Sequence, residues 1–240
     1  MTCEQYILDF SSSGNVFTGR DIYDAIGRDN ISRQSINTIL ARMSAAGQIE
    51  RVSRGKYSTP RAQNMFAPVL SSEATLLYND IRVKYPFAAV CVYQGDWLSH
   101  LMHHMATNNA IYIEVERDVA DVVFDYLRSQ GKNAYYRPDK EIMYRYVDLS
   151  AQPYIVKILT TQSPLSKIGN VPVPTLEKLL VDLYCDKDFN YLQGAEYYHI
   201  MNAAQNLYEL NIPSMLRYAS RRNVKEKIAK IMEESKNDIG

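Results

Sequence analysis

The sequence has few cysteines, no long apolar run and an N-terminus without basic residues. Its three cysteines, Cys3, Cys91 and Cys185, are odd in number and form no CxxC pair, which excludes a disulfide framework and a cysteine zinc site. No apolar stretch approaches the roughly 20 residues needed to cross a bilayer. Glu4 and Asp9 stand where a signal peptide would carry basic residues. These absences predict a cytoplasmic protein with no membrane partner.

Neither sign of charge is in excess. The 27 basic and 27 acidic residues cancel, so any affinity for nucleic acid must come from a local patch. This balance excludes a histone-like binder. With 240 residues, 46% of them hydrophobic, the chain is long enough for two modest domains with real cores.

The common catalytic motifs are missing as well. The sequence contains no glycine-rich phosphate loop followed by lysine, no GxSxG elbow, and no cysteine beside a histidine in a recognisable pattern. We therefore expect no catalytic residues, no resident metal and no cofactor.

The most informative stretch is Val16 to Ser58. A first short helix is predicted over Thr18 to Gly27, because a hydroxyl can cap its start and a glycine ends it. A second helix starts at Asn30 or Ser32 and carries apolar residues at three- and four-residue spacing. Gly47 ends it. Two helices joined by a few polar residues form a helix-turn-helix.

A hairpin follows these helices. Gln48 to Val52 alternates as a strand, Ser53 to Gly55 is a tight turn, and Lys56 to Ser58 can return as a second strand. A helix-turn-helix followed by such a hairpin is a winged helix, with a further helix predicted ahead of it from Thr2 or Cys3 to Phe10.

Polar residues of the second helix and the wing are the predicted DNA contacts. They are Ser32, Arg33, Gln34, Ser35, Asn37, Thr38, Arg54 and Lys56. Arg33 and Gln34 can make paired hydrogen bonds to purine edges, while Arg54 and Lys56 can neutralise backbone phosphates. The alternative is a winged helix that serves only protein interaction.

After a proline-containing linker at Thr59 to Ser71, strand and helix patterns alternate. The predicted elements are helix Ser72–Lys84, strand Phe87–Tyr93, helix Gly95–Met105, strand Ala110–Glu116, helix Val119–Ser129, and strands Asn133–Arg137 and Tyr154–Thr160. Irregular or edge structure is expected over Ser163–Pro174. Three helices follow: the first is capped by Thr175, the second covers Tyr191–Tyr208, and the third runs from Ile212 past Lys230. The fold class is α+β, with a winged-helix domain over residues 1–60 and a mixed α/β domain ending in helices over residues 71–240.

Two groups of residues could carry chemistry. His100, His103 and His104 lie on one predicted helix, where His100 would share a face with the other two and could begin a metal site. Ordinary packing or solvent exposure is the favoured interpretation, because no HExxH pattern is present. Glu114 and Glu116 share a face of a predicted strand, an arrangement that can hold magnesium in nucleotidyltransferases. The glycine-serine pair expected ahead of the acids is Gly95-Asp96 here, and it lies further from them than that pattern normally permits.

The order of these segments, together with the phrase VPVPTLEKLLVDLY at Val171 to Tyr184, resembles AbiEi-type antitoxins of bacterial toxin–antitoxin systems. Pro174, Glu177, Lys178 and Asp182 are similar to the proline, acidic and basic residues and the apolar-Asp step of the family's motif in its larger antitoxin domain. The resemblance implies a repressor of its own operon whose second domain, related in fold to nucleotidyltransferases but without their chemistry, counteracts a nucleotidyltransferase toxin.

Alternatives remain for these residues. Glu177, Lys178 and Asp182 could form plain helix surface with a common ion-pair spacing. Basic residues near the end of the chain, namely Arg217, Arg221, Arg222, Lys225 and Lys227, are interpreted as solvated helix surface, with a DNA or toxin contact as the alternative.

The sequence therefore predicts a non-enzymatic, DNA-binding antitoxin of a type IV system that binds double-stranded DNA at its own promoter. The alternatives are a nucleotidyltransferase that uses Glu114 and Glu116, and a protein-interaction adaptor. Direct contact with the toxin and formation of a homodimer stay open.

Overall fold

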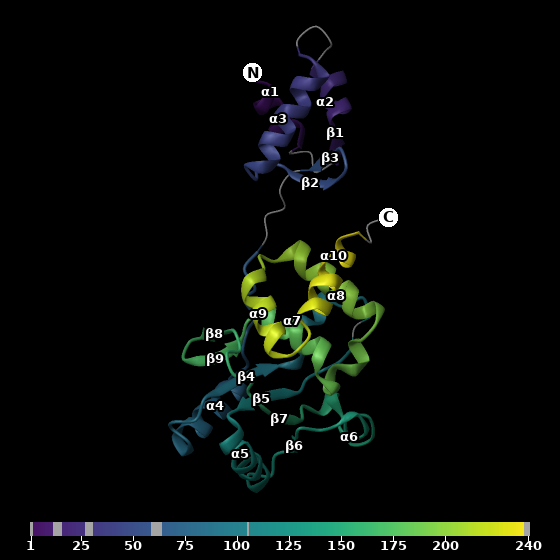
Figure 1. The fold of residues 1–240 in the computed structure, drawn as a ribbon. Helices are drawn as coiled ribbons and strands as arrows, with labels where there is room; N and C mark the ends of the chain where they lie inside the picture. The colour runs from purple at the N-terminus through teal and green to yellow at the C-terminus, as the bar shows by residue number, and fades with distance from the viewer. Residues whose placement is uncertain (1, 12–15, 27–30, 59–63, 105, 238–240) are drawn as a thin grey trace. The chain divides into compact units, whose positions relative to one another are not determined.

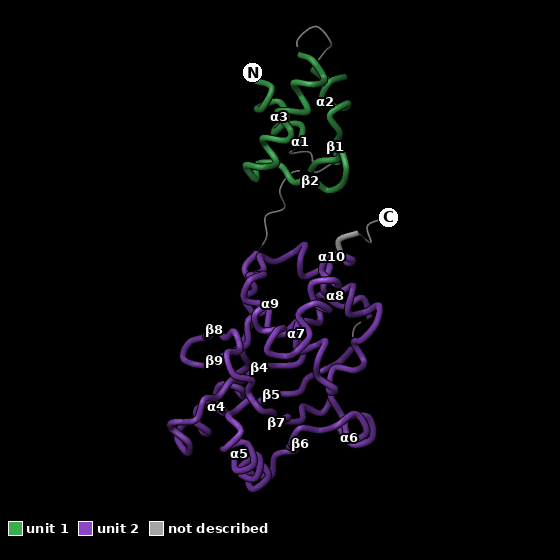
Figure 2. The backbone as a smooth tube through the Cα atoms, in the orientation of Figure 1, with its two compact units in different colours: residues 1–63 green, residues 64–240 purple. Residues whose placement is uncertain are grey.

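The chain divides into two compact units, residues 1–63 (unit 1) and 64–240 (unit 2), which Figure 2 colours separately. The computed structural model describes residues 2–11, 16–26, 31–58, 64–104 and 106–237. Predictions made for Gly27, Asn30, Met105 and residues 59–63 fall outside this part of the chain.

Unit 1 combines helices with a small antiparallel sheet (Figure 1). Its elements are α1 (Cys3–Ser11), β1 (Phe17–Thr18), α2 (Gly19–Ile26), α3 (Arg33–Ala45), β2 (Glu50–Ser53) and β3 (Lys56–Ser58). The sheet order is β1-β3-β2, so the predicted hairpin gains a third strand ahead of α2. This topology is that of a winged helix.

Local capping explains where the helices of unit 1 begin. Ser32 accepts a hydrogen bond from the backbone N–H of Ser35 and caps α3, as predicted. Before α2, Thr18 accepts from the N–H of Asp21, whose carboxylate accepts from the N–H of Thr18. After α3, Gly47 has a φ of 70°, the left-handed conformation that lets a chain leave a helix.

A small core holds unit 1 together. Apolar side chains from every helix and from the sheet are buried in it: Ile7, Phe17, Ile22, Ile36, Leu40, Met43, Ile49 and Tyr57. The α3 residues among them recur at three- and four-residue spacing, the periodicity that the sequence displays. Gly19 packs so closely against α3 that a Cβ there would lie 2.7 Å from Oδ1 of Asn37.

Unit 2 begins with alternating helices and strands. These are α4 (Ser72–Lys84), β4 (Val90–Gln94), the 3₁₀ helix η1 (Gly95–Leu101), β5 (Ile111–Val115), α5 (Arg117–Ser129), β6 (Ala134–Tyr136), α6 (Lys140–Tyr146), the 3₁₀ helix η2 (Leu149–Ala151) and β7 (Tyr154–Ile158). The remaining elements are β8 (Leu165–Ile168), β9 (Val171–Pro174), α7 (Leu176–Cys185), the 3₁₀ helix η3 (Lys187–Leu192), α8 (Ala195–Leu207), α9 (Ile212–Arg221) and α10 (Lys225–Asn237). Helix α6 was not predicted.

A four-stranded mixed sheet forms the centre of unit 2, in the order β4-β5-β7-β6. Strand β4 is antiparallel to β5, whereas β5, β7 and β6 run parallel to one another. In this register Glu114 pairs with Cys91 on one side and with Lys157 on the other. Paired residues share a face, so all three side chains lie on the same face of the sheet.

Helices cover both faces of this sheet. On the face of Glu114, the Lys178 side chain of α7 reaches the sheet, and Phe189 of η3 packs against Tyr112. On the opposite face, the ring of Phe124 on α5 packs against Tyr136 in a tilted arrangement, and Glu73 of α4 accepts a hydrogen bond from Tyr154. The sheet is therefore buried on both sides, as the near-continuous apolar strands require.

Three helix predictions need correction. The helix at Gly95 ends at Leu101, so His103 and His104 lie beyond it. The helix predicted over Tyr191–Tyr208 begins at Ala195, because Lys187–Leu192 form the separate 3₁₀ helix η3. The final helix is two helices, α9 and α10, because Asn223 adopts a φ of 58° between them.

The segment before α4 belongs to unit 2. Asn64 exchanges backbone hydrogen bonds with Leu207 and Glu209, and Phe66 makes edge-to-face ring contacts with Trp97 and Tyr208. The part of the predicted linker that the structure describes is thus docked. The predicted boundary at residue 71 lies inside unit 2.

Taken together, the described residues form a mixed α+β structure with small sheets. Between β7 and α7, where irregular or edge structure was expected, β8 and β9 form a two-stranded antiparallel hairpin. Among the helices that the structure describes, none is both long enough and apolar enough to cross a membrane.

Candidate functional site

The first candidate site is the polar surface formed by α3 and the wing of unit 1. The side chains named from the sequence as DNA contacts are all exposed there: Ser32, Arg33, Gln34, Ser35, Asn37, Thr38, Arg54 and Lys56. In the helix-turn-helix geometry, residues at the start of the second helix meet base edges and the wing meets the phosphate backbone. The role of these residues stays a prediction.

Hydrogen bonds within unit 1 distinguish two groups among five of these eight side chains. The hydroxyl groups of Ser32, Ser35 and Thr38 already bond within α3: Ser32 and Ser35 to each other at 2.8 Å, and Thr38 to a backbone carbonyl. In contrast, the Gln34 and Arg54 side chains have no partner among the described residues. The second group therefore has more donors free for DNA.

The second candidate site is a chain of buried charges in unit 2. Its centre is Lys178 on α7, whose ammonium group lies 2.7 Å from Glu114 on β5 and 2.5 Å from Asp182 one turn further along the helix. All three side chains are at most 3% exposed. Asp182 also accepts hydrogen bonds from Tyr218 and from Arg222.

The same chain continues toward the carboxyl end of β7. Arg222 joins Asp182 to Asp186, and Lys157 joins Asp186 to Asp188. Charges alternate in sign along this path, and it contains four carboxylates and three cations among the described residues. Buried ions need such partners, because an isolated charge in a protein interior is costly.

Burial and partners move the pKa values of these groups in different directions. Burial alone would lower the pKa of Lys178, but Asp182 and Glu114 outweigh it and hold that pKa well above its usual range. Burial raises the pKa of Asp182 and of Asp188 despite their cationic neighbours. Lys157 and Arg222 outweigh the burial of Asp186 and lower its pKa to about 2.

These contacts correct the interpretation of the C-terminal motif. Glu177, Lys178 and Asp182 are buried, so the alternative of plain helix surface is wrong. Glu177 accepts a hydrogen bond from the backbone N–H of Asn211 at 2.7 Å. The assignment of Arg222 to solvated helix surface is also wrong, since Arg222 pairs with Asp182 and Asp186 in the charge chain. Thr175 occupies the cap position of α7 but makes no capping hydrogen bond.

Three members of the charge chain were not predicted from the sequence as site residues. Lys157 lies on β7, Asp186 lies between α7 and η3, and Asp188 lies on η3, so no sequence spacing links them. The sequence did contain one indication of the buried charges: Lys157 interrupts an otherwise apolar strand, directly after Val156.

The carboxylates considered for magnesium binding are engaged elsewhere. Glu114 is paired with Lys178, and Glu116 accepts a hydrogen bond from the backbone N–H of Ala89 at 2.9 Å. Gly95 has a packing explanation, because a Cβ there would lie 2.2 Å from Oδ1 of Asn108. Asn108 in turn bonds the Tyr112 hydroxyl.

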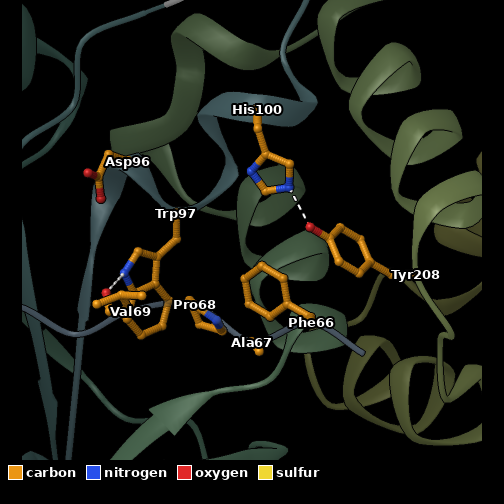
Figure 3. A pocket seen from close by; sticks show the side chains of 8 residues that line it. All are labelled: Phe66, Ala67, Pro68, Val69, Asp96, Trp97, His100 and Tyr208. Carbon is orange, nitrogen blue, oxygen red and sulfur yellow. Dashed lines mark hydrogen bonds between the residues drawn. The ribbon is translucent and has the colours of Figure 1, made fainter. Parts of the chain in front are cut away.

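The histidines do not gather into a metal site, and the described residues contain no cluster suited to hold a metal ion. His100 lines a pocket of about 310 Å³ with Phe66 and Trp97, where its ring nitrogen lies 2.7 Å from the Tyr208 hydroxyl (Figure 3). Partial burial lowers the pKa of His100. His103 and His104 are exposed, and their backbone N–H groups donate to Glu196.

Two models of known protein families match the chain, and together they span residues 5–238. Residues 35–238 match the model described as a family of unknown function (DUF6577), a match that runs from α3 to α10. The chain belongs to this family. Residues 5–60 match a second model, described as a transcriptional regulator, AbiEi antitoxin. No curated protein matches the chain.

The second match confirms the resemblance to AbiEi-type antitoxins. It coincides with the winged helix, from α1 to the end of the wing. The match supports the assignment of DNA binding, transcription regulation and an antitoxin role to this chain.

Proposed function

We propose that this protein represses its own operon through unit 1 and serves, through unit 2, as the antitoxin against a nucleotidyltransferase toxin in a type IV system. The observation that carries the proposal is the match of residues 5–60 to AbiEi antitoxin regulators. The winged-helix topology and the exposed Arg33, Gln34, Asn37, Arg54 and Lys56 support it. Its place of action is the cytoplasm, at the promoter DNA.

Unit 2 supplies the antitoxin activity in this proposal. Its mixed sheet carries Gly95 directly after β4 and Glu114 on β5, an order related to that of nucleotidyltransferases. The proposal assigns no catalysis to this unit, because Glu114 neutralises Lys178 and Glu116 is bonded to the backbone. The motif residues Glu177, Lys178 and Asp182 then stabilise the unit rather than contact the toxin, since all are buried.

Expressing the two units separately beside the neighbouring toxin gene tests this division. The fragments are residues 1–63 and 64–240, because the structure divides there. We expect the first fragment to bind the promoter without protecting cells, and the second to protect cells without repressing. Protection by the first fragment alone, or failure of a folded second fragment to protect, would contradict the antitoxin assignment of unit 2.

A further inference from the structure

A hollow of about 450 Å³ lies in unit 2 at the carboxyl ends of the parallel strands β5, β6 and β7. Its lining comes from the ends of these strands and the residues that follow them, from the end of α7 and the start of η3, and from Arg222 after α9. It includes Arg117, Arg137, Thr160, Asp186, Lys187 and Asp188. Ligands of open α/β sheets bind outside the carboxyl ends of parallel strands.

The basic residues of this hollow are only partly used. Arg117, Arg137 and Lys187 are exposed, and their side chains form no ion pair or hydrogen bond with any described residue. The acidic residues, in contrast, are engaged. Asp186 and Asp188 bind Lys157. The free charge at the mouth of the hollow is therefore positive, although the chain as a whole is neutral.

Two further acids of the lining are also engaged. Asp139 accepts from the N–H of Ile142 and so caps α6, and Glu114 is paired with Lys178. At the start of α5, Glu116 occupies the cap position but makes no capping hydrogen bond, because its carboxylate binds Ala89. The backbone N–H groups at the start of α5 add positive partial charge beside Arg117, its first residue, and Asp118 in the same turn offsets part of it.

The backbone at Arg137 gives an independent indication. Its φ is 43°, in the left-handed region that residues other than glycine rarely adopt. Glycine would fit this position without steric cost. A strained arginine at the rim of a hollow is typical of a residue kept for its side chain.

We propose that this hollow binds a small molecule that carries several phosphate charges, such as a nucleoside polyphosphate. Guanidinium groups match phosphate oxygens with paired hydrogen bonds, and Arg117 and Arg137 supply two of them. Lys187 and the hydroxyl of Thr160 add further donors to the lining. The volume is that of a small-molecule pocket and exceeds what one inorganic phosphate fills.

Calorimetric titration of the full chain with ATP and with inorganic tripolyphosphate tests the site. We expect binding of both probes that weakens with added salt. Equal affinities would show that the phosphates alone are recognised, and tighter binding of ATP would show that the nucleoside contributes; either result supports the site. Failure of both probes to bind at millimolar concentration overturns it.

Variants locate the binding. Each of Arg117→Gln and Lys187→Gln should weaken binding about tenfold, since each removes one charged hydrogen-bond donor. Arg128→Gln is the matched control, because Arg128 is exposed at the other end of α5 and does not line the hollow. Undiminished binding in the Arg117→Gln/Lys187→Gln double variant overturns the proposal.

Arg137→Gly separates binding from folding. This change removes the guanidinium and relieves the left-handed strain, so the melting temperature should stay equal or rise while the affinity falls. If affinity is instead unchanged, Arg137 is no part of the site and the strain argument fails. The hollow lies wholly within unit 2, so these outcomes are independent of promoter binding by unit 1.

Discussion

The ammonium group of Lys178 lies 2.7 Å from the carboxylate of Glu114, and both side chains are almost completely buried. This ion pair connects α7, which carries the motif of the C-terminal half, to the second strand of the sheet. The partner of Glu114 is therefore a lysine of the protein and not a metal ion. The charged residues of the motif, Glu177, Lys178 and Asp182, lie in the interior of unit 2.

Replacing Lys178 by methionine keeps the side-chain length and removes the charge. Glu114 and Asp182 would then be buried without their shared cation, so we expect the free energy of unfolding to fall by about 3–5 kcal/mol. Urea denaturation measures the change. Lys167→Met on β8 is the control, because Lys167 is exposed and should matter little. A Lys178→Met protein as stable as wild type would mean that the buried charge chain does not hold unit 2 together.

Phe66 should anchor the segment before α4 to the rest of unit 2. Its ring packs edge-to-face against Trp97 and Tyr208, so Phe66→Ala should lower the free energy of unfolding by about 2–3 kcal/mol. Val69→Ala is the matched control, since the Val69 side chain is 83% exposed and should change stability by less than about 0.5 kcal/mol.

The same packing decides where unit 2 can be cut. A fragment that starts at residue 64 should be more stable in urea than one that starts at residue 71, which lacks Phe66 and the backbone bonds of Asn64. Equal stability of the two fragments would show that residues 64–70 are a free tether after all.

The pKa of His100 should lie below its usual value of 6.5, because partial burial disfavours the charged ring. A lowered folded-state pKa means that the stability contributed by His100 is present above pH 6.5 and declines as the pH falls below it. Titration of the imidazole by NMR measures this pKa directly. Replacing His100 by glutamine should flatten the decline in stability between pH 7 and 5. A pKa of 6.5 or higher would contradict the neutral, partly buried ring.

Much of the fold could be predicted from local patterns. The three- and four-residue spacing of Ile36, Leu40 and Met43 predicts α3. Ser32 and Gly47 mark the ends of this helix, because capping depends on local hydrogen bonds and backbone conformation and needs no tertiary partner. The strands of unit 2 were visible for a similar reason: they are apolar runs, because both of their faces are covered.

The burial of the charged motif could not be predicted in this way. Glu177, Lys178 and Asp182 have the i,i+4 spacing and polarity of an exposed helix surface, and only the positions of Glu114, Asn211 and other distant partners show that they are interior. The break at Asn223 was also hidden, since the sequence around it remains compatible with one continuous helix.

Catalysis gives a further prediction. Glu114 is committed to Lys178 and Glu116 to the backbone of Ala89, so we expect no magnesium-dependent transfer of labelled nucleotide to RNA or protein. Glu114→Gln and Glu116→Gln serve as comparison variants. Robust labelling by the wild-type chain that disappears in either variant would favour the enzyme alternative instead.

Single substitutions on unit 1 should separate two kinds of DNA contact. Arg54→Ala should weaken binding to all sequences alike, because a residue on the wing meets phosphates. Arg33→Ala should cost about 1–3 kcal/mol and relax sequence preference, as expected of a contact to a base edge. Arg145→Ala is the control, since Arg145 lies on α6 of unit 2 and pairs with Glu141. A loss of preference in Arg54→Ala would reverse these roles.

The most direct test of the account is the affinity of the full chain for its own promoter, measured by fluorescence anisotropy over a range of salt concentrations. The account predicts specific binding that weakens steeply as salt rises, and its loss when Arg33, Arg54 and Lys56 are all changed to alanine. Circular dichroism would confirm that the triple variant is folded, as expected for three exposed side chains. Undiminished promoter binding by that folded variant would contradict the assignment of unit 1 as the DNA-binding surface.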